Sequence, residues 1–264
     1  MDQLAPYTVA SLGSDLRALG VTGGDTVLVH SSASSIGFVA GGSQAVVQAL
    51  LDVLGPDGTL VVPTHTPDNS DPARWGNPPV PESWWPEIRT QAPGFDRSRT
   101  PSRWMGVIAE TVRTWPGALR SDHPHVSFAA VGGQAASVTG VHQLDDALGE
   151  RSPLGAVYRL DGKVLLLGCG HDSNTSLHLA EWRQKSPPRS VEGASVRRPD
   201  GTSEWISWTD VADNTDDFEQ IGAAFEVAVG LSLGQVGDAD ARLTPQRALV
   251  DFATDWMAEH RPLV

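Results

Sequence analysis

Two short apolar segments that flank an amphipathic one constrain the fold more than any other feature of the sequence. Residues 26–30 and 59–63 are compact and apolar, as buried strands are, while residues 43–54 carry apolar side chains at helical spacing. Gly55-Pro-Asp-Gly58 marks a turn between this helix and the second strand. Strand, helix and strand in this order predict an α/β fold built on a mostly parallel sheet.

The remainder of the chain continues this pattern with one interruption. Residues 66–103 are rich in Pro, Asp and Trp and show no period, so we expect an irregular insertion within a single domain spanning residues 1–264. The other predicted elements are strands at 127–131 and 164–168, helices at 7–20, 104–113, near 144–148, 174–184, 216–232 and 245–260, and a β-hairpin at 194–210 around Pro199-Asp-Gly201.

Composition and charge exclude several classes of protein. The net charge is −13, and we find no basic cluster beyond Arg197-Arg198, which argues against a nucleic-acid partner. No apolar run approaches the length of a membrane helix, and the N-terminus lacks the pattern of a secretory signal, so we expect a cytoplasmic protein without a membrane partner. The acidic charge either attracts a polycationic small molecule or only keeps the protein soluble.

The segment from Val164 to Glu181 is the most informative for chemistry. An apolar strand runs into a polar turn and then a helix, and sites in open α/β sheets lie beyond the carboxyl ends of strands. Thr175, His178 and Glu181 are spaced by three, which places them on one helix face. The helix N-terminus disfavours an imidazolium, so His178 suits a general base whose ring Glu181 orients. The alternative is a histidine paired with glutamate only for stability.

Other sites are weaker candidates. Cys169, the only cysteine, is a candidate nucleophile, but no Lys or Arg adjoins it and we expect a buried structural thiol. The sequence has no GxSxG elbow of a serine hydrolase. Two interpretations of another class stay open: a metal-dependent hydrolase or a non-enzymatic binding module. Their candidate residues are His65, His123 and His125 for the first, and Trp75, Trp84 and Trp85 for the second.

Several motifs occur in an order that resembles one known family. They are Val29-His-Ser-Ser-Ala-Ser-Ser-Ile-Gly37 with Gly41-Gly42, Pro63-Thr64, Phe95-Asp96 with Thr100-Pro101, Met105-Gly-Val-Ile-Ala-Glu110, His123-Pro124 with Ser127-Phe128, Ser152-Pro153-Leu154, Leu167 through Glu181, and Asp217 through Gly222. Each motif is weak alone, but together they cover most of the chain. The sequence resembles the antibiotic N-acetyltransferases that acetylate the 3-amino group of aminoglycosides.

The resemblance implies a three-layer α/β/α core with a mostly parallel sheet and inserted hairpin and helical elements, unlike the other large acetyltransferase superfamily. It implies acetyl-coenzyme A as donor, no metal, and a cationic aminoglycoside as acceptor, whose acetylation confers antibiotic resistance. We expect the insertion at about 66–103 to shape the acceptor pocket, and the resemblance also implies roles for particular residues. These are His178, Glu181 and Thr175 in catalysis; Ser31, Ser32, Ser35, Ile36, Gly37, Thr100, Pro101 and Met105 in coenzyme A binding; and Asp172, His171, Asp217 and Glu219 in acceptor binding.

The loop Ser31–Gly37 suits a pyrophosphate on physical grounds as well. Its small side chains let backbone N–H groups approach an anion, and a helix begins near Gly42. It is not a Walker loop, because no lysine follows Gly42-Ser43. The sequence leaves open which amine is acetylated, including amines outside the aminoglycosides, and leaves open the oligomeric state, with a homodimer as one option.

Overall fold

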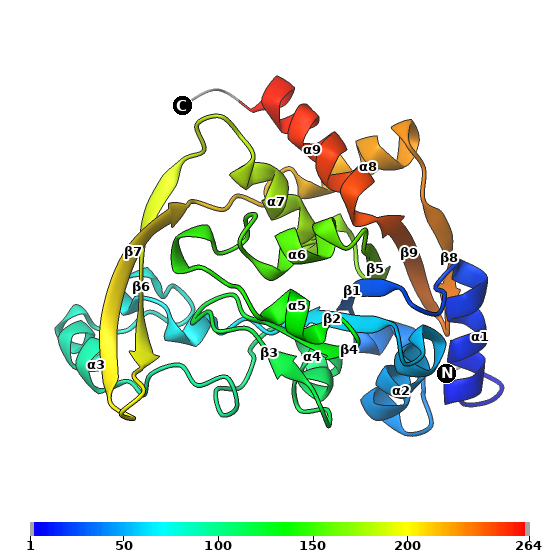
Figure 1. The fold of residues 1–264 in the computed structure, drawn as a ribbon, viewed down its shortest axis with the longest axis horizontal. Coiled ribbons are helices and arrows are strands. Elements are labelled where there is room, and N and C mark those ends of the chain that lie inside the picture. Colours follow the sequence, from blue (N-terminus) through cyan, green and yellow to red (C-terminus); the bar gives the residue numbers. More distant parts are fainter. Residues whose placement is uncertain (1–2, 262–264) are drawn as a thin grey trace.

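The computed structural model describes residues 3–261 of the 264-residue chain. Within that range a seven-stranded sheet has the order β3-β4-β2-β1-β5-β9-β8 (Figure 1). The strands are β1 (Thr26–Ser31), β2 (Thr59–Pro63), β3 (Leu119–Arg120), β4 (Phe128–Gly132), β5 (Lys163–Leu167), β8 (Ser232–Val236) and β9 (Ala239–Pro245). The central strands β2, β1 and β5 are parallel, and the strands on both sides pair antiparallel.

Successive residues of β1 point to opposite faces of the sheet, and each face carries its own apolar core. Val27 and Val29 pack toward α1 (Val9–Leu19), α2 (Gly42–Leu54) and α4 (Gly106–Arg113). Leu28 packs on the other face, in a core shared with α5 (Ala135–Thr139), α6 (Pro153–Arg159), α7 (Ser176–Trp182), α8 (Phe218–Ala228) and α9 (Gln246–His260). This arrangement confirms the three-layer α/β/α fold.

The helices begin and end where local chemistry permits. The hydroxyl of Thr8 accepts a hydrogen bond from Ser11 N, and Ser11 Oγ accepts one from Thr8 N, which together cap α1. Gly20 ends α1 with a φ of 110°, a left-handed conformation that glycine adopts without strain. These caps hold α1 within the range 7–20 in which the sequence predicts a helix.

The irregular segment 66–103 packs against a separate two-stranded sheet. It contains η2 (Pro67–Asn69), η3 (Pro72–Arg74), η4 (Glu82–Trp84) and α3 (Trp85–Gln91). The hairpin of β6 (Arg189–Arg197) and β7 (Ser203–Val211) lies beside α3 and away from the main sheet (Figure 1). The two segments approach closely at Gly94, where a Cβ would lie 2.3 Å from the carbonyl carbon of Val196. The hairpin predicted from Pro199-Asp-Gly201 is confirmed.

Some element boundaries differ from the prediction. The expected helix near 144–148 is a single 3₁₀ turn, η5 (Leu144–Asp146), and the helix expected at 174–184 is α7, preceded by η6 (His171–Ser173). The helix expected at 216–232 ends at Ala228, because the chain then forms β8 and β9, which were not predicted. A last 3₁₀ turn, η1 (Ala33–Ile36), follows β1.

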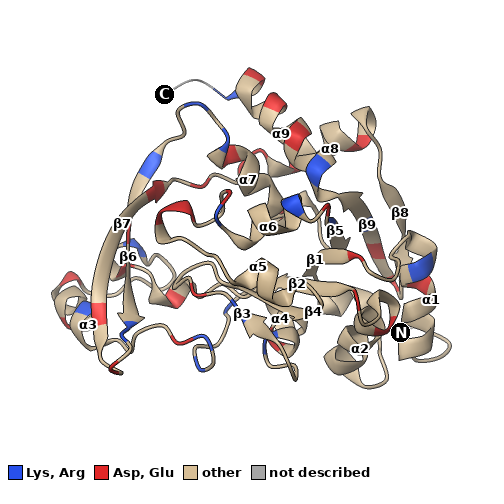
Figure 2. Cartoon of the chain, in the orientation of Figure 1, with Lys and Arg blue, Asp and Glu red and all other residues tan. Residues whose placement is uncertain are grey.

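Charged residues are distributed over many elements. Figure 2 shows Lys and Arg interspersed with Asp and Glu instead of gathered into one basic face. No helix within residues 3–261 is long and apolar enough to span a bilayer.

Candidate active site

Three histidines lie near the carboxyl ends of the three parallel strands. His30 lies in β1, His65 follows β2, and His178 lies on α7, which follows β5. The carboxyl ends of parallel strands meet at one edge of a sheet, so these residues converge there. Burial, with a smaller contribution from repulsion by His178, lowers the pKa of His30 and of His65 to about 3. His30 and His65 are therefore neutral at pH 7.

His178 and Glu181 form a buried pair. The distance between His178 Nδ1 and Glu181 Oε2 is 2.5 Å, and the two side chains are 8% and 3% exposed. In a neutral ring this contact places the proton on Nδ1, which donates it to the carboxylate. The lone pair of Nε2 is then available to accept a proton. The structure thus brings together the two residues that the helical spacing placed on one face.

The third residue of that face, Thr175, contacts the neighbouring strand. Its hydroxyl lies 3.2 Å from His30 Nε2. Thr175 is the N-cap residue of α7, but its side chain makes no capping hydrogen bond. Asn174 supplies it instead: Asn174 Oδ1 accepts a hydrogen bond from Ser176 N at 3.2 Å. The start of α7 is therefore fixed by a buried amide.

The second carboxylate oxygen of Glu181 is held by the C-terminal end of α9. Arg261 Nη1 donates to Glu181 Oε1 at 2.5 Å, and Asn214 N donates to the same oxygen at 3.1 Å. Arg261 also pairs with both carboxylate oxygens of Asp217, at 2.6 and 2.8 Å. Burial opposes the charge on Arg261, but its bonds to Asp217 and Glu181 outweigh this and raise its pKa. Glu181 is therefore oriented from both sides.

The loop predicted to bind coenzyme A is joined to the strand that precedes α7. Ser35 Oγ donates to Gly168 O at 3.2 Å and to Ser32 Oγ at 3.1 Å. Ile36 is buried. Gly37, with a φ of 87°, packs against Asp238, because a Cβ there would lie 2.4 Å from Asp238 Oδ2. The loop is thus tied to the end of β5, and the hydroxyl of Ser35 lies close to it.

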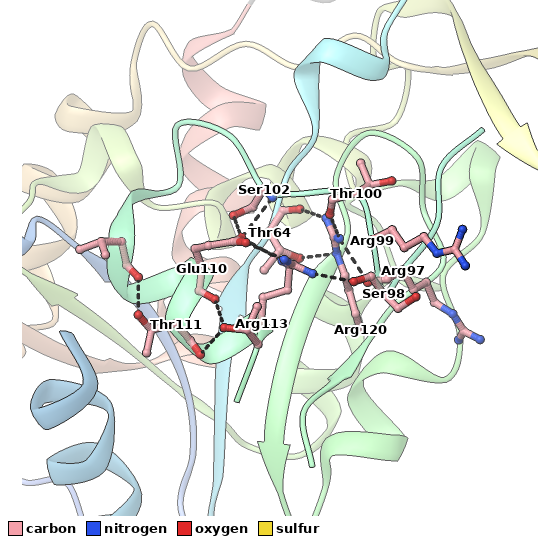
Figure 3. Close-up of polar contacts among 12 residues, drawn as sticks. Thr64, Arg97, Ser98, Arg99, Thr100, Ser102, Glu110, Thr111, Arg113 and Arg120 are labelled. Atoms are coloured by element: carbon pink, nitrogen blue, oxygen red, sulfur yellow. Dashed lines mark hydrogen bonds and ion pairs between the residues drawn. The ribbon is translucent and has the colours of Figure 1, made fainter. Parts of the chain in front are cut away.

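The segment that contains Thr100 and Pro101 is tied to the sheet by Arg120 (Figure 3). Arg120 Nη2 donates to Thr64 O at 2.8 Å, and its Nη1 donates to the carbonyls of Arg97 and Thr100. Burial lowers the pKa of Arg120 to about 10, which leaves it charged at neutral pH. Thr100 and Pro101 line a hollow of about 390 Å³, separate from the cavity that Met105 lines.

Glu110 anchors the following residues to α4 (Figure 3). Its Oε2 accepts hydrogen bonds from Ser102 Oγ at 2.6 Å and Ser102 N at 3.2 Å, and both of its oxygens accept from Arg113. Gly106, at the start of α4, lies beside Ser31, since a Cβ there would be 3.6 Å from Ser31 O. The segment before α4 and the serine loop are therefore neighbours.

The four residues predicted to bind the acceptor are engaged within the protein. His171 is buried and lies 3.2 Å from Glu226, and Glu219 Oε1 accepts a hydrogen bond from Asp172 N at 2.9 Å. Asp217 is paired with Arg261. The exposed side chains of Asp172 and Glu219 lie on the α8 side of α7. Their role in acceptor binding stays a prediction.

A cavity of about 350 Å³ is lined by Trp182 of α7 and by Pro67, Ser70 and Arg74 of the 66–103 insertion, the segment expected to shape the acceptor pocket; His178 itself is not among its lining residues. His65 and Trp182, which line it, both lie near His178, and the ring centroids of Trp182 and His178 are 6.4 Å apart. Its other lining residues include Trp104, Met105 and His123, with Glu192, Trp208, Asp210 and Asp213 on or after the hairpin. Its lining residues are spread along the sequence, and the sequence indicated only part of it, through the 66–103 insertion, His65 and the His123-Pro-His125 motif.

Two of the rival interpretations lose support. Burial raises the pKa of Cys169 to about 11, which disfavours the thiolate that a nucleophile needs. Among residues 3–261 no group of three His, Cys, Asp or Glu side chains is arranged to hold a metal ion. His65, His123 and His125 do not form a metal centre in the described part of the chain.

Comparisons with known proteins identify the family of the chain. The sequence profile described as "Aminoglycoside 3-N-acetyltransferase" matches residues 28–258. The chain is 43% identical to the SPbeta prophage-derived aminoglycoside N(3')-acetyltransferase-like protein YokD of Bacillus subtilis (strain 168), over 95% of this chain and 92% of that one. It is 37% identical to aminoglycoside N(3)-acetyltransferase III of Pseudomonas aeruginosa, over 96% and 94%.

Solved structures show the same likeness. The crystal structure of YokD from Bacillus subtilis superposes with a TM-score of 0.96 at 41% identity, covering 99% of this chain and 97% of that one. The structure of AAC-IIIb, binary with CoASH, superposes with a TM-score of 0.86 at 30% identity, covering 98% and 100%.

Proposed function

The chain belongs to the aminoglycoside 3-N-acetyltransferase family, and on that premise we propose that it transfers an acetyl group from acetyl-coenzyme A to an amine of an aminoglycoside, with His178 as general base. The observation that carries this proposal is the buried His178–Glu181 pair on α7, the helix whose Trp182 lines a cavity with carboxylates in its wall. The 3-amino group is the proposed site of acetylation, as the name of the family indicates. Acetylation there would protect the host from the antibiotic.

The proposed chemistry needs one proton acceptor and no covalent intermediate. The acceptor amine attacks the thioester carbonyl carbon while His178 Nε2 removes a proton from the nitrogen. The carbon–sulfur bond then breaks, and the imidazolium returns its proton to the departing sulfur, so that the products are an acetamide and free coenzyme A. Glu181 stabilises the imidazolium through the bond to Nδ1. The hydroxyl of Thr175 is a candidate donor to the oxyanion.

The donor site is proposed along the serine loop and the start of α4. The loop Ser31–Gly37 offers small side chains and hydroxyls, and Gly106 brings the first turn of α4 beside Ser31. Backbone N–H groups at such positions favour phosphate oxygens. Thr100, Pro101 and Met105 lie on the segment that leads into α4, where we propose that they contact the pantetheine arm. The likeness to AAC-IIIb, whose solved structure is binary with CoASH, supports this class of donor.

The test is a thiol-release assay with acetyl-coenzyme A and a panel of aminoglycosides, with the acetylated position determined by NMR. We expect His178→Ala to reduce turnover about 100-fold or more, because the general base is removed. The matched control is His260→Ala, which removes an exposed histidine that stacks on Trp256 at the end of α9. Turnover in His178→Ala equal to that of the control would refute the base, and an absence of thiol release with every aminoglycoside would refute the activity.

A further inference from the structure

The N-terminal segment, residues 3–7, is hydrogen-bonded to the residues that directly follow the serine loop. Tyr7 N donates to Phe38 O at 2.9 Å and Ala40 N donates to Tyr7 O at 2.8 Å, which forms a parallel bridge between Tyr7 and Val39. The side chain of Gln3 bonds to the same backbone: its Nε2 donates to Phe38 O at 3.0 Å, and its Oε1 accepts from Phe38 N at 2.9 Å. Both backbone polar groups of Phe38 are therefore held by this segment.

The side chain of Tyr7 joins the serine loop to the turn between β8 and β9. The helix α1, which follows the N-terminal segment, packs beside β8 (Figure 1), and this brings Tyr7 to the turn. Tyr7 Oη donates to Asp238 Oδ1 at 2.5 Å, and Asp238 N donates to Ile36 O at 3.0 Å. The hydrogen bond to Asp238 raises the pKa of Tyr7, so the hydroxyl keeps its proton at neutral pH and remains the donor.

Two glycines let the ring of Tyr7 lie directly on the backbone of the loop and of the turn. A Cβ at Gly37 would be 3.1 Å from Tyr7 Cε2, and a Cβ at Gly237 would be 3.3 Å from Tyr7 Cδ2. Gly237 N also donates to Asp15 Oδ2 at 3.0 Å, which ties the turn to α1. The ring of Tyr7 thus packs against the loop and the turn together.

The shape of the serine loop depends on contacts from outside the loop. Its 3₁₀ turn, η1, is four residues long, and the side chain of Ser32 does not cap it. The end of β5 holds the loop on one side, where Ser32 N donates to Leu167 O at 2.9 Å. The N-terminal segment and Asp238 hold it on the other. A loop that must be ordered during binding lowers affinity, so contacts that order it beforehand raise affinity for its ligand.

We propose that the N-terminal segment and Asp238 form a clamp that holds the serine loop in the shape that coenzyme A binds, with Gln3 and Tyr7 as positioning residues for the donor. The proposal rests on the proposed function, since it takes the serine loop as the donor site. Neither Gln3, Tyr7 nor Asp238 lines the cavity that Trp182 borders. Loss of the clamp should therefore weaken binding of the donor and leave the acceptor and the chemical step unchanged.

Tyr7→Phe tests the clamp because it keeps the ring on the two glycines and removes only the hydroxyl that binds Asp238. We expect the Kd of coenzyme A, measured by isothermal titration calorimetry, and the KM for acetyl-coenzyme A to rise about fivefold. The kcat and the KM for the aminoglycoside should stay within about twofold of the wild type. Tyr158→Phe is the matched control: it removes the chain's other tyrosine hydroxyl, which donates to Asp251 Oδ1 at 2.7 Å, and should leave all four values unchanged.

Gln3→Ala tests the other end of the clamp. It removes both side-chain hydrogen bonds to the backbone of Phe38 and leaves Tyr7 in place. We expect coenzyme A to bind about threefold more weakly, again without a change in kcat. Gln48→Ala is the control, since it removes a glutamine whose side chain donates to Asp52 on the same helix at 2.7 Å.

The calorimetry separates the two proposals because it needs no acetylation. If the wild type binds coenzyme A but acetylates no aminoglycoside, the proposed function fails, and the Kd values still decide whether the clamp exists. If Tyr7→Phe and Gln3→Ala bind coenzyme A as tightly as their controls, the clamp is overturned while the function stands. An equal rise in both KM values, or a fall in kcat as large as the rise in KM, would also overturn it, because the contacts would then support the fold as a whole. A wild type that does not bind coenzyme A would overturn both proposals.

Discussion

At the scale of single residues, Arg261 controls the site through Glu181. One carboxylate oxygen of Glu181 faces His178 and the other faces Arg261, with both distances at 2.5 Å. The positive charge of Arg261 draws electron density from the carboxylate and so weakens its hold on an imidazolium. Arg261 touches neither substrate in the proposed mechanism, and we regard it as a positioning residue.

Replacing Arg261 by Gln tests this role. We expect Arg261→Gln to lower kcat about 10-fold with little change in the KM for acetyl-coenzyme A, because Glu181 Oε1 then keeps only the hydrogen bond from Asn214 N. The acidic limb of the pH–rate profile should also move to higher pH, since the freed carboxylate stabilises the imidazolium more strongly. Arg247→Gln, which removes an arginine paired with the exposed Asp161, is the control. If Arg261→Gln lowers the stability of the protein but leaves the acidic limb of its pH–rate profile unchanged, Arg261 has only a structural role.

Cys169 provides a second test at this scale. A thiol with a pKa of about 11 holds roughly 100-fold less thiolate at neutral pH than an ordinary cysteine. We therefore expect alkylation by iodoacetamide at pH 7.5 to be about 100-fold slower in the folded protein than in urea. Cys169→Ser should keep kcat within about twofold. Rapid alkylation of the folded protein, or an inactive serine variant, would restore Cys169 as a candidate nucleophile.

Sequence reasoning found the residues that are close together along the chain. Thr175, His178 and Glu181 were predicted because a helix brings residues three apart onto one face. Arg261 was missed because 80 positions separate it from Glu181, and no local pattern indicates such a contact. Trp208 was missed for the same reason: it reaches the cavity only because the hairpin folds back toward α7.

At the scale of elements, the packing of α8 against η6 helps to fix the start of α7. Gly222 lies where α8 meets His171, and a Cβ there would lie 2.0 Å from His171 Cγ. Alanine normally favours a helix over glycine by about 1 kcal/mol, but overpacking a filled interior costs about 1–3 kcal/mol. The clash is therefore expected to outweigh the gain in helix propensity.

We expect Gly222→Ala to lower the melting temperature and reduce kcat, since His171 and the adjoining Asn174 would shift. Thermal unfolding and steady-state assays measure the two effects. Ala223→Ser changes the next residue of the chain, which is exposed, and is the matched control. It should alter both the melting temperature and kcat only slightly. A Gly222→Ala variant as stable as the wild type would show that α8 and η6 are packed loosely enough to admit a methyl group.

The elements that sequence reasoning recovered are those with strong local signals. β1, β2 and β5 are buried apolar runs, and each was predicted at or within one residue of its observed bounds. β8 was missed because four of its five residues are exposed, which removes the apolar signal of a buried strand. The antiparallel pairing of β4 with β2 depends on how the insertion returns the chain to the sheet, and this is not encoded locally.

At the scale of the whole molecule, buried neutral histidines make stability depend on pH. The pKa values of His30 and His65 are about 3 and that of His142 is about 4, whereas in the unfolded chain each is near 6.5. Between these values the unfolded state binds protons that the folded state does not. Stability is therefore lost as pH falls below about 6.5, by up to about 1.4 kcal/mol per pH unit for each such histidine.

Asp210 has the opposite effect on how the stability of the fold depends on pH. Burial raises its pKa to about 6, so the folded state binds its proton before the unfolded state does, and this group adds stability as pH falls from about 6 to 4. One carboxyl opposes three or more histidines, so the net effect should be a loss of stability in mild acid. We also predict that residues 1–264 behave as one domain, which requires a single cooperative transition.

Urea unfolding at pH 7, 6 and 5 tests both expectations. We expect one transition whose midpoint falls steadily with pH, and about 2 kcal/mol of stability lost per buried histidine at pH 5. Asp210→Asn should make the loss steeper because it removes the compensating group, whereas His260→Gln, an exposed histidine, should leave the slope unchanged. A stability that is flat between pH 7 and pH 5 would mean that these histidines already bind protons in the folded state, which would contradict the low pKa values that burial gives them.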